Sequence, residues 1–181
     1  MRAPLFTLGH SNRSSEDFLA LLRDAGVEIL VDIRVRPRSA RHPQFDEAAL
    51  RALLEAAGIQ YHWAGRQLGG LRQAAPDSPH RALPEGLRGY ADHMQTELFR
   101  RSAAQLRQIM ARGTTAVMCA ERLPEDCHRR LLSDYLTLEG ITVVHLIGPG
   151  ESRPHLLSPE ARRESAALIY DRHLSGELPL E

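Results

Sequence analysis

The segment from Cys119 to Arg130 carries the densest set of reactive side chains in the sequence, with two cysteines, one histidine, three acids and three arginines. A thiolate can act as a nucleophile, a neutral imidazole as a base, and a guanidinium as a phosphate ligand. Asp126 is a good N-cap, which would place the next three residues in the first turn of a helix. Backbone N–H groups there favour anions and lower the pKa of a thiol.

Two arginines, Arg129 and Arg130, fall in this expected first turn, where the helix dipole opposes positive charge. They fit better if they bind an anion that also meets the helix N-terminus. The alternative is that they pair with neighbouring acids, as exposed arginines commonly do.

Two thiol chemistries are consistent with this segment. In one, a cysteine is a nucleophile, and His128 or His10 is its base. In the other, Cys119 and Cys127 form a redox pair across the residues between them. A phosphatase-like or rhodanese-like loop is excluded, because its arginine would stand six residues after the cysteine, where this chain has Glu125 and Ser133.

Two further chemistries remain open. Cys119, Cys127 and His128 could bind zinc, with Asp32 or another histidine completing the site, although the spacing matches no common zinc pattern. Alternatively Cys119 is inert, and Glu121 and Asp32 carry out acid–base work. The Pro-Cys-x-x-Cys of zinc deaminases is missing, so the Cys-Ala-Glu sequence is not evidence for that class.

A second cluster of charge lies between Arg34 and His42, with four arginines, one histidine and no acid. All 23 basic residues of the chain are arginines, and 23 acids balance them. Codon usage could explain the absence of lysine, and selection for forked phosphate donors is the alternative. Alternation along a strand puts Asp32 and Arg34 on one face, and Cys119 and Glu121 on another.

Regular elements must position these residues, and apolar periodicity predicts them. The expected strands are Leu5–His10, Glu28–Arg34, Gln60–Ala64, Thr115–Ala120 and Ile141–Ile147. The expected helices are Ser14–Ala25, a helix capped by Asp46 and ending at Gly58, Leu98–Arg112, Cys127–Glu139 and Pro159–Leu174. A glycine separates helix from strand four times, at Gly26, Gly58, Gly113 and Gly140.

This alternation indicates βαβ units. We therefore expect one α/β domain over residues 1–181, a Rossmann-like three-layer αβα fold with a mainly parallel sheet of about five strands. Residues 66–94 are rich in glycine and proline and are expected to form a long loop over the site. Residues 148–181 are expected to hold the last helix and a tail.

Ligands of parallel α/β proteins bind at the carboxyl ends of the strands. The expected strands all bring titratable groups near that edge, including His62 and His145, for which a structural rim role is the alternative. The catalytic candidates are Cys119, Glu121, Asp32, His10, Cys127 and His128. The substrate-binding candidates are Ser11, Arg34, Arg38, Arg129, Gly69, Gly70 and His93.

Composition limits the class of protein. Hydrophobic residues at 43% and charged residues at 25% are ordinary for a globular domain and exclude a disordered chain or a fibre. No apolar run is long enough to span a membrane, and two cysteines are too few for a disulfide scaffold. We therefore expect a cytoplasmic protein with no membrane partner.

Several short motifs in order resemble a known family, the domain-of-unknown-function family 488, over nearly the whole chain. They are Thr7–Ser11, Val31–Arg34, Pro37–Ser39, Pro43–Phe45, Leu68–Gly70, Tyr90 with His93 and Met94, Met118–Glu121, Cys127–Arg129, and His155 with Leu156. The resemblance implies that these residues form one site, and it implies no reaction. Some members are labelled as DNA-repair proteins.

The first functional hypothesis is an enzyme of the hydrolase or transferase type that acts on an anionic, phosphate-bearing substrate, either a nucleotide or a nucleic acid. The second is a module that binds nucleic acid without chemistry, in which Trp63 is a stacking platform, with a place in the core as the alternative. The groove along the nucleic-acid backbone would be lined by Arg34, Arg36, Arg38, Arg41 and His42. A thiol redox or zinc protein, and a scaffold, are further alternatives. The sequence determines neither the cofactor, for which zinc is one candidate, nor the oligomeric state.

Overall fold

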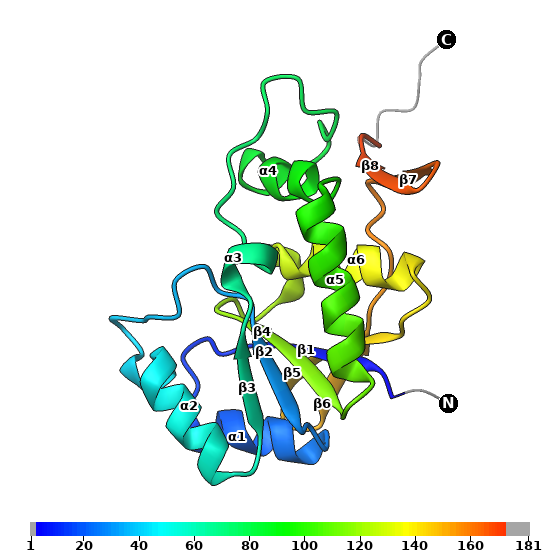
Figure 1. Cartoon of the computed structure of the whole chain (residues 1–181). Coiled ribbons are helices and arrows are strands. Elements are labelled where there is room, and N and C mark those ends of the chain that lie inside the picture. The colour runs from blue at the N-terminus through cyan, green and yellow to red at the C-terminus, as the bar shows by residue number, and fades with distance from the viewer. Residues whose placement is uncertain (1–2, 173–181) are drawn as a thin grey trace.

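The computed structural model describes residues 3–172 and has an α/β architecture built on a six-stranded sheet (Figure 1). The order across the sheet is β3-β2-β4-β1-β5-β6, and the first five of these strands in the chain run parallel. Their bounds are β1 Leu5–Gly9, β2 Ile29–Asp32, β3 Gln60–Trp63, β4 Thr115–Cys119, β5 Val143–Gly148 and β6 Glu151–Pro154. The predicted fold class is therefore confirmed, with an antiparallel strand β6 added at one edge.

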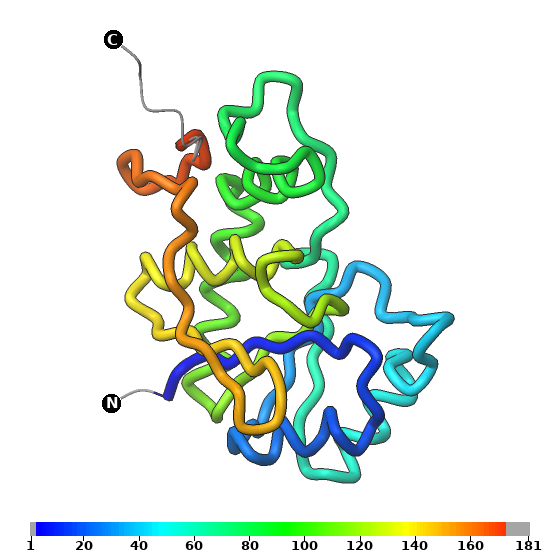
Figure 2. The backbone as a smooth tube through the Cα atoms, turned by 180° about the vertical axis from the view of Figure 1, so that it is seen from behind, coloured from blue at the N-terminus to red at the C-terminus, as the bar shows by residue number. Residues whose placement is uncertain are grey.

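The helices cover both faces of the sheet, with α1 and α2 on one face and α5 and α6 on the other (Figures 1 and 2). Their bounds are α1 Ser15–Asp24, α2 Glu47–Ala56, α3 Gly65–Leu68, α4 Glu85–His93, α5 Glu97–Met110 and α6 Arg129–Leu138. A separate antiparallel hairpin, β7 Ala161–Glu164 and β8 Ala167–Tyr170, lies beside α4.

Alternation along the strands divides the buried apolar residues into two cores. Val31 and Ile33 of the β2 segment point to the core under α5 and α6, whereas Leu30 points to the core over α1 and α2. In the same way Val117 and Cys119 of β4 lie on the α5–α6 side, and Met118 on the other. Cys119 therefore enters the site from a fully buried strand.

Local signals account for the predicted helix ends. The Ser14 hydroxyl accepts a hydrogen bond from the Asp17 amide at 3.0 Å and caps α1. Gly26 follows α1 with a φ of 67°, in the left-handed region that glycine adopts without strain. Asp46 stands at the N-cap position of α2, but its carboxylate accepts from the Ser39 amide instead. This contact ties the arginine-rich loop to α2.

The predicted helix Pro159–Leu174 is wrong over the residues that the structure describes, where β7 and β8 form a hairpin. Ser165 turns the chain with a φ of 53°. Three contacts fix Tyr170 in extended backbone: its hydroxyl bonds Asp134, its amide bonds His80, and its carbonyl accepts from Ala82. These tertiary contacts outweigh a helical propensity. Residues 173–181, with the rest of the expected tail, lie outside the described residues.

The expected long loop is also partly helical. Residues 66–68 belong to α3 and residues 85–93 form α4, so the irregular connection is confined to 69–84. Gly70 and Leu71, at the start of this connection, line the site, as do Gly86 and Leu87 in the first turn of α4, which follows it.

Within residues 3–172, no helix combines the length and the apolar character that crossing a membrane requires.

Candidate functional site

A cavity of about 380 Å³ opens at the carboxyl ends of three adjacent strands, β1, β2 and β4. Its polar and thiol-bearing side chains come from residues at or just after the ends of these strands, or from residues just before α6. The polar lining is His10, Arg34, Arg36, Arg38, Ser39, Glu121, Asp126 and His128, with Cys119 and Cys127, and the remainder is Val35, Gly70, Leu71, Gly86, Leu87 and Ala120. This cavity lies at the sheet edge where the sequence analysis places a site, and its function stays a prediction.

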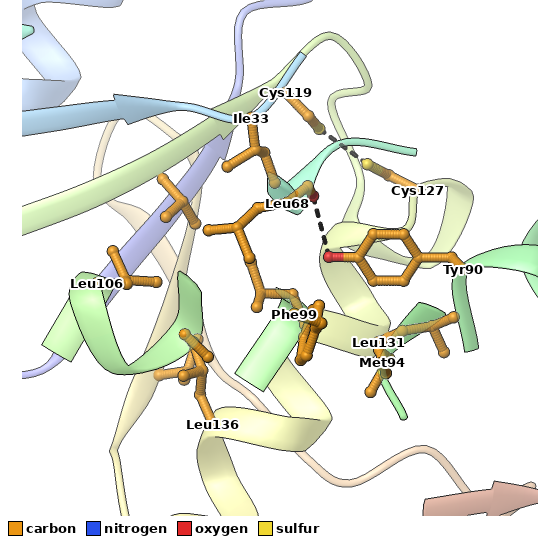
Figure 3. Close-up of a cluster of buried hydrophobic side chains, with 14 of the residues drawn as sticks. Ile33, Leu68, Tyr90, Met94, Phe99, Leu106, Cys119, Cys127, Leu131 and Leu136 are labelled. Atoms are coloured by element: carbon orange, nitrogen blue, oxygen red, sulfur yellow. Dashed lines mark hydrogen bonds between the residues drawn. The ribbon is translucent and has the colours of Figure 1, made fainter. Parts of the chain in front are cut away.

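The two cysteines point toward each other across the cavity wall (Figure 3). Cys127 Sγ donates a hydrogen bond to Cys119 Sγ at 3.0 Å, and both thiols are free and buried. This bond and burial raise the pKa of Cys127 well above its ordinary value. Burial alone would raise the pKa of Cys119 too, but the hydrogen bond from Cys127 and the nearby Arg129 charge hold it below its ordinary value. Of the two thiols, Cys119 is therefore the one that loses its proton first and forms the thiolate.

Arg129 is fully buried beneath this pair and does not line the cavity. Its Nη2 donates to the carbonyls of Glu121 and Arg122, at 3.1 and 3.2 Å. Its Nε and Nη1 are buried without a hydrogen-bond partner, and no carboxylate of residues 3–172 forms an ion pair with it. The predicted contact of Arg129 with a substrate does not agree with this burial. The arginine instead supplies a buried positive charge that helps to lower the pKa of Cys119.

The start of α6 also differs from the prediction. Pro124–Asp126 form a 3-10 turn, Cys127 is extended with φ −140° and ψ 150°, and the helix begins at Arg129. Cys127 Sγ accepts a hydrogen bond from the Arg129 amide at 3.4 Å. The Cys127 sulfur, rather than the Asp126 carboxylate, thus satisfies a free N–H at the helix N-terminus.

Asp32 lies behind the cavity wall and does not line it. Its carboxylate accepts from Arg34 Nε at 3.0 Å and Nη2 at 2.7 Å, from the Arg34 amide, and from the Tyr61 hydroxyl at 2.6 Å. Burial and this carboxylate raise the pKa of Tyr61. Asp32 therefore positions Arg34 and is fully occupied, so direct acid–base work on a substrate is not a role that this geometry provides.

Arg34 carries a donor that this pairing leaves over. Its Nη1 is buried and has no hydrogen-bond partner among the described residues, while the side chain lines the cavity. An unpaired buried guanidinium nitrogen is costly, and an anionic ligand would satisfy it.

His10 stands beside Cys119, since its amide donates to the Cys119 carbonyl at 3.0 Å. Its Nδ1 lies 2.9 Å from the Ser11 carbonyl, which can only accept, so Nδ1 carries the proton and Nε2 the lone pair. Burial lowers the pKa of His10 to about 4. His10 is thus a neutral imidazole with a free acceptor. Ser11, with a φ of 48°, follows it but lies outside the cavity lining.

His128 covers the other side of Cys127, with Nδ1 3.5 Å from the Cys127 sulfur. Burial and Arg129 lower its pKa to about 4, so its ring is neutral near pH 7. Gly70 packs against this ring so closely that an added Cβ would lie 2.7 Å from Nδ1. Gly69 packs against the backbone of the preceding turn instead and does not line the cavity.

Three other predicted histidines lie elsewhere. His93 Nε2 donates to the Gln67 carbonyl at 2.6 Å, and its ring packs on Tyr90 and Phe99, away from the cavity lining. His62 and His145 are also outside that lining. Burial and the adjacent His155 lower the pKa of His145 to about 3.

His145 belongs to a buried hydrogen-bonded chain that connects the sheet to α6. Thr7 Oγ1 lies 2.6 Å from His145 Nδ1, His145 Nε2 lies 2.9 Å from His155 Nδ1, and His155 Nε2 lies 2.8 Å from Asp134. These contacts give His145 and His155 a structural role.

Sequence reasoning missed the apolar part of the cavity. Leu71 is 83% exposed at its rim, and its φ of 57° is unfavourable for a branched residue. Arg72 anchors this turn through hydrogen bonds to the carbonyls of Gly69, Arg66 and Gln67. An exposed leucine next to two glycines is a signal that a search for charged residues overlooks.

Metal binding finds little support in this part of the chain: among residues 3–172, no three side chains of histidine, cysteine, aspartate or glutamate gather as a metal site would require. The zinc alternative therefore lacks a ligand set of that kind there.

Comparison with known families gives one match. The model of the family described as domain of unknown function DUF488 matches residues 14–136, most of the chain, and this range includes Asp32, Arg34, Cys119 and Cys127. No curated protein and no solved structure matches the chain.

Proposed function

The chain belongs to the DUF488 family, whose description assigns no activity, and on this premise we propose that the protein is an enzyme that uses Cys119 as a nucleophile on a phosphate-bearing substrate. The observation that carries the proposal is the hydrogen bond from Cys127 Sγ to Cys119 Sγ beside the buried Arg129. This arrangement favours a thiolate at Cys119, the nucleophilic form of cysteine.

The cationic side of the cavity supports an anionic substrate. Arg34 offers its unpartnered Nη1, and Arg36 and Arg38 line the same cavity as Cys119. Guanidinium groups match the geometry of phosphate oxygens and stay charged at all physiological pH values. A phosphate held by these arginines lies in the same cavity as the thiolate.

The proton chemistry falls to the histidines. A neutral His10, with its lone pair on Nε2, suits a base that takes a proton from water or a hydroxyl group, and not an acid. In the proposed sequence, Cys119 displaces a leaving group and forms a covalent intermediate, and a water activated by His10 then releases the product. The leaving group takes its proton from solvent, or from the protonated form of Glu121 or Asp126, the two exposed acids that line the cavity.

The apolar side of the cavity adds a specificity element. The apolar side chains of Val35, Leu71 and Leu87 line it and can contact a non-polar group next to the phosphate. A mononucleotide or an aryl phosphate has this combination of an anionic and a planar apolar part.

The test is turnover of a panel of aryl phosphates and mononucleotides, with intact-protein mass spectrometry to trap the intermediate. Cys119→Ser should abolish turnover and the adduct, while Arg38→Met should raise KM. Arg107→Met is the matched control, because Arg107 pairs with Glu139 on the surface away from the cavity. Retention of turnover by Cys119→Ser would refute the proposal.

A second candidate is nucleic-acid binding without chemistry, with a repair role as one context for it. Three exposed arginines, Arg36, Arg38 and Arg41, lie on one loop without an acid, which favours a polyanion. Trp63 is 38% exposed, and its indole donates to the Arg34 carbonyl. Binding alone should survive Cys119→Ser and Glu121→Gln and weaken steeply with salt, whereas catalysis should be lost in these variants.

A further inference from the structure

The sulfur atoms of Cys119 and Cys127 are 3.0 Å apart, and neither is in a disulfide. A disulfide bond has a length of about 2.05 Å, so closing one here needs a shift of about 1 Å. The two residues are eight positions apart, and their side chains point at each other (Figure 3).

The two cysteines differ in how firmly they are held. Cys119 ends β4, a central strand that pairs with β1 and β2 on its two sides. Cys127 lies between the turn Pro124–Asp126 and the start of α6, outside the sheet. The small movement that closes a disulfide therefore falls to Cys127, at the cost of its contact with the Arg129 amide.

We propose that Cys119 and Cys127 form an oxidation site, in which Cys119 reduces a hydroperoxide and Cys127 then closes a reversible disulfide with it. Cys119 and Cys127 are both among the residues that line the cavity, and each is almost fully buried, so a peroxide that reaches them has to be small. Cys119 is the residue oxidised first, because Cys127 is the hydrogen-bond donor of the pair and the Arg129 guanidinium bonds the Glu121 carbonyl that Cys119 Sγ also contacts.

The chemistry balances in two steps. The Cys119 thiolate attacks the peroxide, an S–O bond forms as the O–O bond breaks, and after uptake of a proton the products are a sulfenic acid and water or an alcohol. Cys127 then attacks the sulfenic sulfur, the S–S bond forms as the S–O bond breaks, and the proton of Cys127 leaves with the hydroxide as water. An external dithiol returns the two electrons and two protons.

The proposed oxidation and the proposed function both use the Cys119 thiolate. Only one consequence rests on the proposed function, namely that turnover is lost reversibly when Cys119 is in a disulfide. The oxidation itself needs no phosphate-bearing substrate. It is therefore measured on the protein alone.

The experiment treats the reduced, full-length protein with equimolar hydrogen peroxide, blocks remaining thiols with N-ethylmaleimide, and records the intact mass and a non-reducing gel. The expected product is a monomer that has lost two hydrogen atoms and takes up no maleimide, and dithiothreitol should restore both thiols. The chain has only two cysteines, so the assignment of the bond is unambiguous.

Two variants separate the roles of the cysteines. Cys127→Ser should stop at a Cys119 sulfenic acid that dimedone traps, at a peroxide consumption rate close to that of the wild type. Cys119→Ser should slow both peroxide consumption and the appearance of a dimedone adduct by about tenfold or more, because the remaining thiol keeps its proton near pH 7. Circular dichroism establishes that both variants are folded.

Equal peroxide reactivity of the two single variants would overturn the proposal, as would a wild-type product consisting only of intermolecular dimers or of sulfinic acid. The outcome is independent of the proposed function. If the disulfide forms but no phosphate-bearing compound is turned over, the proposed function fails alone, whereas turnover without a disulfide defeats this inference alone.

Discussion

Arg34 grips the carboxylate of Asp32 with two hydrogen bonds, from Nε to Oδ1 at 3.0 Å and from Nη2 to Oδ2 at 2.7 Å. The pair is almost entirely buried, and the Tyr61 hydroxyl occupies the remaining side of the carboxylate. One nitrogen of the guanidinium, Nη1, remains unpartnered in the described part of the chain. The ion pair thus fixes the orientation of a cation that lines the cavity.

Replacing Asp32 by Asn should destabilise the protein by about 3 kcal/mol, because the change leaves Arg34 as a buried charge without its partner. Tyr61→Phe is the matched control, since it removes one hydrogen bond to the same carboxylate and should cost about 1 kcal/mol. Urea denaturation measures both. A smaller loss in Asp32→Asn than in Tyr61→Phe would contradict this account of the pair.

Replacing Arg129 by Met should change reactivity more than stability. Removal of the buried charge raises the pKa of Cys119, and the thiolate fraction at neutral pH falls about tenfold for each pKa unit. The stability should change little, because a buried cation without a carboxylate partner is itself costly. The pH profile of Cys119 alkylation by iodoacetamide, followed by peptide mass, gives the pKa.

Arg130→Met is the control for this prediction, since Arg130 is the next residue and pairs with Glu160 instead. The pH profile of Cys119 alkylation in Arg130→Met should be the same as in the wild type. Parallel shifts in both variants would point to a general effect of charge and not to Arg129.

Two glycines of the cavity should respond oppositely to alanine. An added Cβ at Gly70 would lie 2.7 Å from His128 Nδ1, so Gly70→Ala forces the ring or the turn to move and should cost about 1–3 kcal/mol. At Gly86, in the first turn of α4, nothing lies within 4 Å of an added Cβ. Gly86→Ala should therefore stabilise the protein by up to about 1 kcal/mol through helix propensity. Thermal denaturation of the two variants tests both predictions. A Gly70→Ala protein as stable as the wild type would show that the His128 ring accommodates the added methyl group without cost.

Leu71→Gly should stabilise the protein or leave it unchanged, because glycine adopts the φ of 57° without the strain that leucine carries, about 1 kcal/mol. Leu98, an exposed leucine in the first turn of α5, provides the comparison, since Leu98→Gly should cost up to about 1 kcal/mol. In titration calorimetry, Leu71→Gly should weaken binding of phenyl phosphate relative to inorganic phosphate. Destabilisation by Leu71→Gly would mean that the leucine packs against the fold rather than a ligand.

The stability of the protein should fall as the pH decreases below about 6.5, the unperturbed pKa of histidine. Burial lowers the pKa of His145 to about 3, so between pH 6.5 and 3 the unfolded chain binds a proton at this site that the folded chain does not. The contribution of His145 to the free energy of unfolding is therefore fully present above pH 6.5. It is lost at about 1.4 kcal/mol per pH unit as the pH falls below that value. His145→Gln should flatten the slope between pH 6.5 and 5 by that amount, and an unchanged slope would assign the pH dependence to other groups.

The sequence by itself determined the five parallel strands, the helices between them and the edge at which their carboxyl ends meet, but not α3, α4, β6 or the hairpin of β7 and β8. Apolar periods located the parallel strands, and Gly26, Gly58 and Gly140, each with a positive φ, marked the ends of helices. These signals are local, since each depends on a few consecutive residues and the backbone that they favour. Because strand direction then follows from the βαβ alternation, the placement of His10, Arg34 and Cys119 at one edge could be predicted.

Only the tertiary structure decided what each of those side chains does. The order of the strands sets β4 between β1 and β2, and the register across β2 and β3 brings the Tyr61 hydroxyl onto Asp32. The burial of Arg129 and the contact of the two sulfurs depend on the path of the chain between β4 and α6. The local sequence around these residues does not predict such contacts. The contacts arise from the packing of whole elements and not from local propensity.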